Sequence, residues 1–156
     1  MIFEEPGAGA TTRIWMVTGD LGRSKRLDPA VIIRVYLDGN PIPIIDAPLP
    51  DLFDGSTPPF LPPLVENQPF SSGDNYSYVP IPYRRGCRVA LVGADSKKLW
   101  YQFSFHRLAE ASNINTFTGA EDFGDWASLL SADGDPWPID SNGKTSPPLS
   151  SRARSL

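Results

Sequence analysis

Hydrophobic and polar residues alternate along several short stretches of the chain, which is the pattern of half-buried β-strands. Over residues 11–18, Trp15 and Val17 fall on one face of the predicted strand, and Ile14 and Met16 fall on the other. A strand with apolar side chains on both faces belongs inside a sandwich or at a subunit interface. We therefore expect both faces of this strand to be covered.

A hairpin is predicted around Asp38 and Gly39. Residues 31–37 form an apolar run rich in β-branched side chains, and Asp-Gly is a strong turn signal because glycine accepts a positive φ at no steric cost. Ile42, Ile44 and Ile45 then continue the chain as the second strand of the predicted hairpin.

Two later strands are predicted over residues 88–92 and 99–108. In the second of them, Tyr101, Phe103 and Phe105 share one face. The short polar segment 93–98 lies between the two strands and predicts that they form a second hairpin.

The rest of the chain is punctuated by proline and glycine. Residues 41–82 hold eleven of the seventeen prolines, so a long irregular excursion is expected there, followed by an extended segment over 76–83 at a sheet edge. A short helix is predicted over 121–130, near the C-terminus. Residues 1–132 are thus predicted to form one all-β sandwich domain, with a disordered or non-native tail over 133–156.

Composition narrows the class of protein. A hydrophobic content of 40%, a charged content of 21% and a net charge of −4 are ordinary for a soluble globular domain, and they favour no nucleic-acid partner. No apolar run approaches the length of a membrane span. Cys87 is the only cysteine in the sequence, so no internal disulfide can form, and we expect its thiol to be packed in the interior. We expect no metal and no cofactor, because His106 is the only histidine and has no second histidine or cysteine nearby.

The N-terminal residues bear on the compartment of the protein. Glu4 and Glu5 are predicted to lie on the surface, before the first strong strand. The acidic start carries no signal-peptide pattern, which indicates a cytoplasmic protein as written, or a secreted one whose true start has been lost.

Three candidate ligand contacts lie in the loop over residues 48–55. Asp51, Phe53 and Asp54 are expected to reach solvent there, where the two carboxylates could bind a sugar hydroxyl or act as a dyad. The alternative is that both aspartates hydrogen-bond to their own backbone and form turns.

Two aromatic residues complete the set of candidate ligand contacts. Trp15 could stack on a sugar ring, or it could be a buried core residue. Tyr78 borders the irregular segment and could bind a ligand through its hydroxyl, or it could pack at the sheet edge.

Three blocks of sequence resemble glycoside hydrolase family 172, in the order and spacing of its N-terminal half. The blocks are Gly7-Ala-Gly9 with Arg13-Ile-Trp15-Met, then Arg34-Val-Tyr-Leu-Asp38-Gly39 with Pro48-Leu-Pro-Asp51-Leu-Phe53, then Tyr76-Ser-Tyr78-Val-Pro-Ile-Pro-Tyr83. The resemblance implies the first half of a double jelly roll, a furanoside-containing glycan as partner, and homo-oligomers built on trimers.

The resemblance also implies where catalysis would occur. Family members use two glutamates of the second jelly roll, in patterns such as W-W-G-E-G and E-D-Y-F, and neither pattern occurs in this chain. The segment Pro50-Asp-Leu-Phe53 resembles E-D-Y-F and is its counterpart in the first half of the family. It has Pro50 at the position of the catalytic glutamate. Two hypotheses follow: a truncated piece of a furanosidase that is inactive alone, or a non-catalytic jelly-roll module for carbohydrate binding or oligomer assembly.

Overall fold

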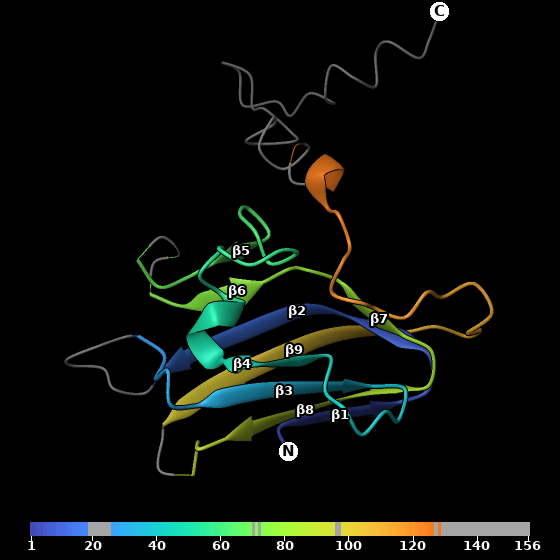
Figure 1. The fold of residues 1–156 in the computed structure, drawn as a ribbon, viewed down its shortest axis with the longest axis horizontal. Coiled ribbons are helices and arrows are strands. Elements are labelled where there is room, and N and C mark those ends of the chain that lie inside the picture. The colour runs from blue at the N-terminus through green and yellow to red at the C-terminus, as the bar shows by residue number, and fades with distance from the viewer. Residues whose placement is uncertain (19–25, 70, 72, 96–97, 127, 129–156) are drawn as a thin grey trace, which may run out of the picture. The chain divides into compact units, whose positions relative to one another are not determined.

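The computed structural model describes residues 1–18, 26–69, 71, 73–95, 98–126 and 128 of the 156-residue chain (Figure 1). The chain divides into two compact units, Met1–Phe123 and Gly124–Leu156. All the strands in the described part of the chain lie in the first unit.

The first unit consists of two antiparallel sheets. The four-stranded sheet contains, in spatial order, β1 (Phe3–Pro6), β8 (Gly86–Val92), β3 (Ile32–Leu37) and β4 (Ile45–Pro48). The five-stranded sheet is built around β2 (Gly9–Thr18), which pairs with β6 (Asn75–Ser77), β7 (Ile81–Tyr83) and β9 (Leu99–Arg107), while β5 (Val65–Glu66) pairs with β6. The predicted all-β sandwich is confirmed.

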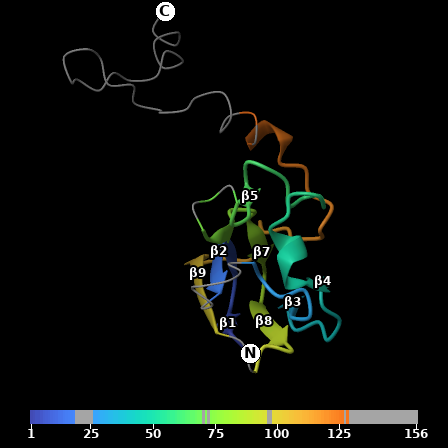
Figure 2. The ribbon, with the colours of Figure 1, turned by 90° about the vertical axis from the view of Figure 1, so that its left-hand side faces the viewer.

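The core lies between the two sheets, which are seen edge-on in Figure 2. Ile33 and Val35 of β3 are fully buried, and so are Ile14 and Met16 of β2. In each strand the intervening residues are less buried. Period-two alternation therefore sets which face of each strand enters the core, as the sequence predicted.

A β-bulge changes the inward face of β2 near its start. The register between β2 and β9 shifts between Thr11 and Arg13. As a result Thr11 is buried together with Ile14, whereas strict alternation would have placed Thr12 on that face. A bulge adds one residue to one strand, so the side-chain phase differs on its two sides.

The predicted hairpin between residues 88–92 and 99–108 is wrong, although both strands exist. β8 pairs with β1 on one edge and with β3 on the other, so neither edge of β8 is available to β9. β9 instead crosses to the other sheet and pairs with β2 along its whole length.

The hairpin of β3 and β4 is confirmed, but its turn is wider than predicted. Asp38 and Gly39 both have positive φ, 57° and 77°, and the Asn40 side chain accepts a hydrogen bond from the backbone N–H of Ile42 at 3.0 Å. β4 begins only at Ile45, so the prediction that the strand starts at Ile42 is wrong. The prolines at 41 and 43 have no backbone N–H to contribute to a ladder.

The short helix near the C-terminus is confirmed, with a later start. Residues 124–126 and 128 are helical. Before them, the Glu121 carboxylate accepts hydrogen bonds from the backbone N–H groups of Thr118 at 2.6 Å and Gly119 at 2.9 Å, which closes a turn where the helix was expected to begin. The predicted end of the helix at 130, the predicted domain boundary at 132 and the predicted tail over 133–156 lie outside the described residues. No helix in the described part is long and apolar enough to cross a membrane.

Candidate functional site

The loop over residues 48–55 does not present Phe53 to solvent. A 3-10 turn, η1 (Leu49–Leu52), fills half of this segment, and the backbone N–H of Phe53 donates to the Pro50 carbonyl at 3.0 Å. Phe53 is 1% exposed and lies in the core with Leu49 and Leu52. The expectation that its ring reaches solvent is wrong, because the turn directs this apolar cluster inward.

The two aspartates of this loop remain at the surface. Asp54 accepts hydrogen bonds from the backbone N–H of Ser56 at 2.9 Å and from the Ser56 hydroxyl at 2.7 Å. This is the turn-forming arrangement that was the alternative to a ligand contact. Asp51 is exposed within η1, and its role in binding stays a prediction.

Trp15 and Tyr78 lie together on the outer face of the five-stranded sheet. Trp15 pairs in register with Tyr76 of β6. The Tyr76 and Tyr78 rings are 5.2 Å apart, and the Arg13 guanidinium lies over the Tyr78 ring at 5.9 Å from its centroid. We call Arg13, Trp15, Tyr76 and Tyr78 the aromatic platform.

Two carboxylates and one amide hold the aromatic platform in place. The Trp15 indole N–H donates to Asp74, and the Arg13 guanidinium donates to the Gln102 amide oxygen at 3.4 Å. Burial, together with the charge and hydrogen bond of Glu66, raises the pKa of Tyr76 to about 12. The Tyr76 phenol is therefore neutral at physiological pH, and the rings have fixed neighbours.

The aromatic platform remains accessible from outside. Tyr78 is 46% exposed, and Trp15 is half-buried. The π-faces of such rings are electronegative and attract the polarised C–H bonds of a sugar, while the neighbouring polar groups can bind hydroxyls. Among the described residues, no group of three His, Cys, Asp or Glu side chains could hold a metal ion.

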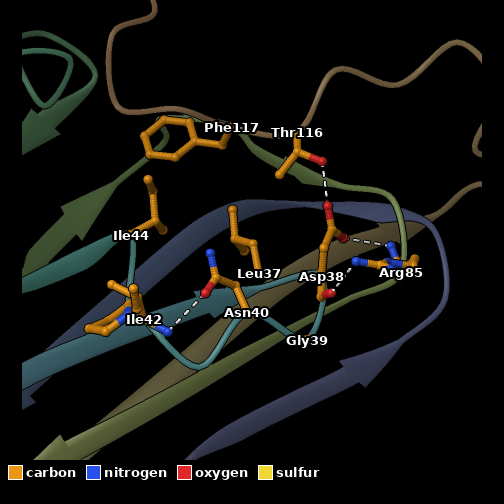
Figure 3. A pocket seen from close by; sticks show the side chains of 10 residues that line it. Leu37, Asp38, Gly39, Asn40, Ile42, Ile44, Arg85, Thr116 and Phe117 are labelled. Carbon is orange, nitrogen blue, oxygen red and sulfur yellow. Dashed lines mark hydrogen bonds between the residues drawn. The ribbon is translucent and has the colours of Figure 1, made fainter.

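A pocket of ≈ 470 Å³ lies at the β3–β4 turn (Figure 3). Its apolar wall includes Leu37, Ile44 and Phe117, and its polar rim includes Asp38 and Arg85. Asp38 connects three segments of the chain: its carboxylate accepts from the backbone N–H groups of residues 84 and 85, at 2.8 and 2.6 Å, and from the hydroxyl of residue 116.

The Asp38 carboxylate acts as a clamp, that is, its hydrogen bonds hold the β3–β4 turn to residues 84, 85 and 116. Burial raises its pKa, but the hydrogen bonds from Thr116, Arg85 and Arg84 lower the pKa more, and the net shift is downward. All three hydrogen bonds are directed at the charged form, so this group is a poor general base. The pocket is thus bounded by a structural carboxylate.

The substitution Asp38→Asn tests this clamp. An asparagine side chain would tolerate the positive φ and keep one oxygen acceptor, but it would lose the charge and the second acceptor oxygen. We therefore expect a loss of about 1 kcal/mol in the free energy of unfolding at neutral pH. Because the folded-state pKa is lowered, the wild-type contribution is present above the ordinary value of 3.8 and is lost as pH falls below it. Urea unfolding at pH 7 and in acid should show the two proteins converging in acid; a constant difference would contradict the clamp.

Glu5, on β1, is a buried acidic residue. Glu5 is 6% exposed, contrary to its predicted surface position, and its carboxylate accepts a hydrogen bond from Arg107 of β9. Nearby, Cys87 is 1% exposed, which confirms the expected packed thiol, and this burial raises its pKa to about 11. The Tyr83 hydroxyl is buried, and no described residue lies in hydrogen-bond geometry with it.

The structure therefore assembles only part of the predicted site. It brings Trp15 and Tyr78 together, and it leaves Asp51, Phe53 and Asp54 near β4, in the other half of the sandwich. The sequence places Arg13 on the same strand face as Trp15 and makes Tyr76, like Tyr78, a possible binding residue, but it does not predict that Tyr76 lies beside Trp15. Alternation within each strand was the available signal, because Arg13 shares its predicted face with Trp15.

A model of the GH172 first β-sandwich domain, that is, the first such domain of glycoside hydrolase family 172, matches residues 1–124. A search of curated proteins found no match. The matched residues contain the aromatic platform and the pocket.

Proposed function

Because this chain belongs to glycoside hydrolase family 172, with residues 1–124 matching the first β-sandwich domain of the family, we propose that the domain binds a furanoside-containing glycan and does not hydrolyse it by itself. The aromatic platform is the binding surface. The observation that carries this proposal is the convergence of Trp15, Tyr76 and Tyr78 on one accessible sheet face, with Arg13 and two carboxylates around them.

The ring geometry favours an extended carbohydrate over a compact polar ligand. Tyr76 and Tyr78 are tilted by 58° to each other, so together they offer a stepped surface and not a single plane. A chain of five-membered sugar rings presents successive C–H faces at changing angles and could rest on such a surface. The Tyr78 hydroxyl and the free donors of Arg13 would then bind sugar oxygens.

The same surface lacks the means for glycoside hydrolysis. That reaction needs a proton donor and a second carboxylate across the scissile bond. Asp74 is engaged by the Trp15 indole, and Glu66 is engaged by Tyr76, so each carboxylate positions an aromatic ring. The sequence also contains neither glutamate pattern of the family's catalytic half. We therefore assign the domain a binding role and expect no turnover.

Affinity electrophoresis through gels that contain a fructofuranosyl or arabinofuranosyl polysaccharide tests this proposal. Wild-type protein should be retarded by at least one of the two polysaccharides. Tyr78→Ala should lose about tenfold in affinity, which corresponds to about 1.4 kcal/mol and is within the range for loss of an aromatic contact.

Two variants serve as matched controls. Tyr78→Phe keeps the ring and should retain most of the retardation. Ile42→Ala removes a side chain that is 71% exposed on the β3–β4 turn and should behave as wild type. The proposal fails if neither polysaccharide retards the wild-type protein, or if Tyr78→Ala and Ile42→Ala migrate alike.

A further inference from the structure

The outer face of the five-stranded sheet continues past the aromatic platform onto β9, which lies beside β2 (Figure 1). Trp15 pairs in register with Gln102 of β9, and Val17, the next residue on the same face of β2, pairs with Trp100. Trp100 therefore lies on the same face of the sheet as Trp15, and its side chain is 51% exposed. A further accessible indole thus lies beside the aromatic platform, on a strand that contributes none of the platform's residues.

Tyr78, Trp15 and Trp100 lie on a diagonal line across three neighbouring segments of the sheet. The register of β2 and β6 puts Tyr78 beside Arg13, whose guanidinium lies 5.9 Å from the centroid of the Tyr78 ring. Trp15 follows two residues later on β2, and Trp100 lies opposite Val17, a further two residues along. Diagonal neighbours of this kind are about 7–8 Å apart, so the three aromatic residues follow one another at similar intervals. We call these three residues the aromatic diagonal.

Polar side chains flank the aromatic diagonal on β2 and β9. The Arg13 guanidinium donates to the Gln102 amide oxygen at 3.4 Å, and this contact connects β2 to β9 between Tyr78 and Trp100. The Gln102 side chain is exposed, and its NH₂ group, like the guanidinium, carries N–H donors that sugar oxygens accept from. The surface therefore combines ring faces for the C–H bonds of a sugar with donors for its hydroxyl oxygens, from Tyr78 to Trp100.

The position of these rings on a sheet face decides which form of a glycan they suit. A pocket surrounds a small ligand and buries most of its surface, whereas one sheet face contacts a ligand from a single side. The affinity for one sugar unit is then small, and binding depends on several contacts made by the same chain. Each further contact is intramolecular and raises the overall affinity. A row of rings on an open face therefore favours a long, linear ligand.

We propose that Trp100 determines the length of glycan that this domain binds: an internal segment of a linear furanoside chain lies along the aromatic diagonal, with separate sugar units on Tyr78, Trp15 and Trp100. The inference rests on the proposed function, because Tyr78 and Trp15 belong to the aromatic platform. It adds that the ligand is the interior of a polymer chain, and not a monosaccharide, a disaccharide or a chain end. A short ligand on Tyr78 and Trp15 ends before Trp100, and a longer one contacts all three rings.

Isothermal titration calorimetry with linear fructofuranosyl and arabinofuranosyl oligosaccharides, from disaccharide to octasaccharide, tests this inference. The affinity of the wild type should rise with chain length and level off once all three rings are covered. Trp100→Ala should bind the shortest measurable ligand as the wild type does, and should lose about tenfold in affinity for the longest, as expected for one aromatic contact. Unchanged binding of the short ligand also shows that the variant is folded.

Two further variants control for the loss of an exposed aromatic side chain. Trp100→Tyr keeps a ring and should retain most of the dependence on chain length. Tyr101→Ala is the matched control, because Tyr101 is 41% exposed but pairs in register with the buried Met16, on the opposite face of the sheet. This variant should match the wild type at every ligand length.

Three results would overturn the inference, and they can be told apart. If Trp100→Ala loses the same factor at every length, or binds as Tyr101→Ala does, while Tyr78→Ala still weakens binding, the role of Trp100 fails and the proposed function stands. If the wild type binds no oligosaccharide of any length, both fail. If Trp100→Ala changes the mass measured by light scattering but not the dependence on chain length, Trp100 is covered by a second copy of the chain and not by glycan.

Discussion

Phe53→Ala is expected to destabilise the protein by about 3–5 kcal/mol, the usual cost of removing a fully buried aromatic side chain. Phe53 is 1% exposed and packs in the core with Leu49 and Leu52. The free energy of unfolding, measured by urea denaturation, should fall by this amount, which is a large fraction of the about 5–15 kcal/mol that a whole domain typically has.

Asp51→Ala is the matched control for Phe53→Ala. Asp51 is exposed two residues earlier in the same loop, so its removal should change stability by no more than about 0.5 kcal/mol. If Phe53 were a solvent-facing ligand contact, both variants would keep wild-type stability. Such a result would contradict the inward packing of the loop.

Gly9→Ala is expected to cost about 3 kcal/mol, at the upper end of the range for overpacking. A Cβ at this position would lie 2.5 Å from the backbone oxygen of His106 and 2.9 Å from the Tyr83 hydroxyl oxygen. The carbonyl belongs to β9 and cannot move without disturbing its ladder with β2. Glycine at position 9 therefore allows β9 and Tyr83 to approach β2 closely.

Gly7→Ala separates this steric effect from backbone strain. Gly7 has a φ of 86°, but a Cβ there would meet nothing within 4 Å. Only the conformational cost of a positive φ is expected, about 1–2 kcal/mol. Thermal unfolding of the two variants should rank Gly9→Ala as clearly less stable. Equal melting temperatures would contradict the close approach at Gly9.

The sequence predicted strands well because alternation depends on local spacing. Residues 11–18, 88–92 and 99–107 lie in strands, as predicted, although the last strand ends one residue before the predicted end at 108, and Ile14 and Met16 enter the core. Alternation reports which face of a strand is buried, but it does not report which strand lies beside it. That is why β8 and β9 were predicted to pair, although both edges of β8 are occupied by other strands.

The candidate site was predicted in part for a similar reason. Trp15 and Tyr78 could be chosen individually as accessible aromatic residues, but their proximity depends on the pairing of β2 with β6, which are far apart in sequence. Phe53 was assigned to solvent because prolines and aspartates surround it. Its burial depends on the core beneath η1, which local composition does not encode.

The most direct test of the proposed function is an NMR titration of the tryptophan indole N–H signals with a fructofuranosyl or arabinofuranosyl oligosaccharide. The Trp15 signal should shift saturably as the oligosaccharide concentration rises. The oligosaccharide should remain intact throughout. Absence of any shift at Trp15 with both sugars, or the appearance of hydrolysis products, would contradict a non-catalytic glycan-binding domain.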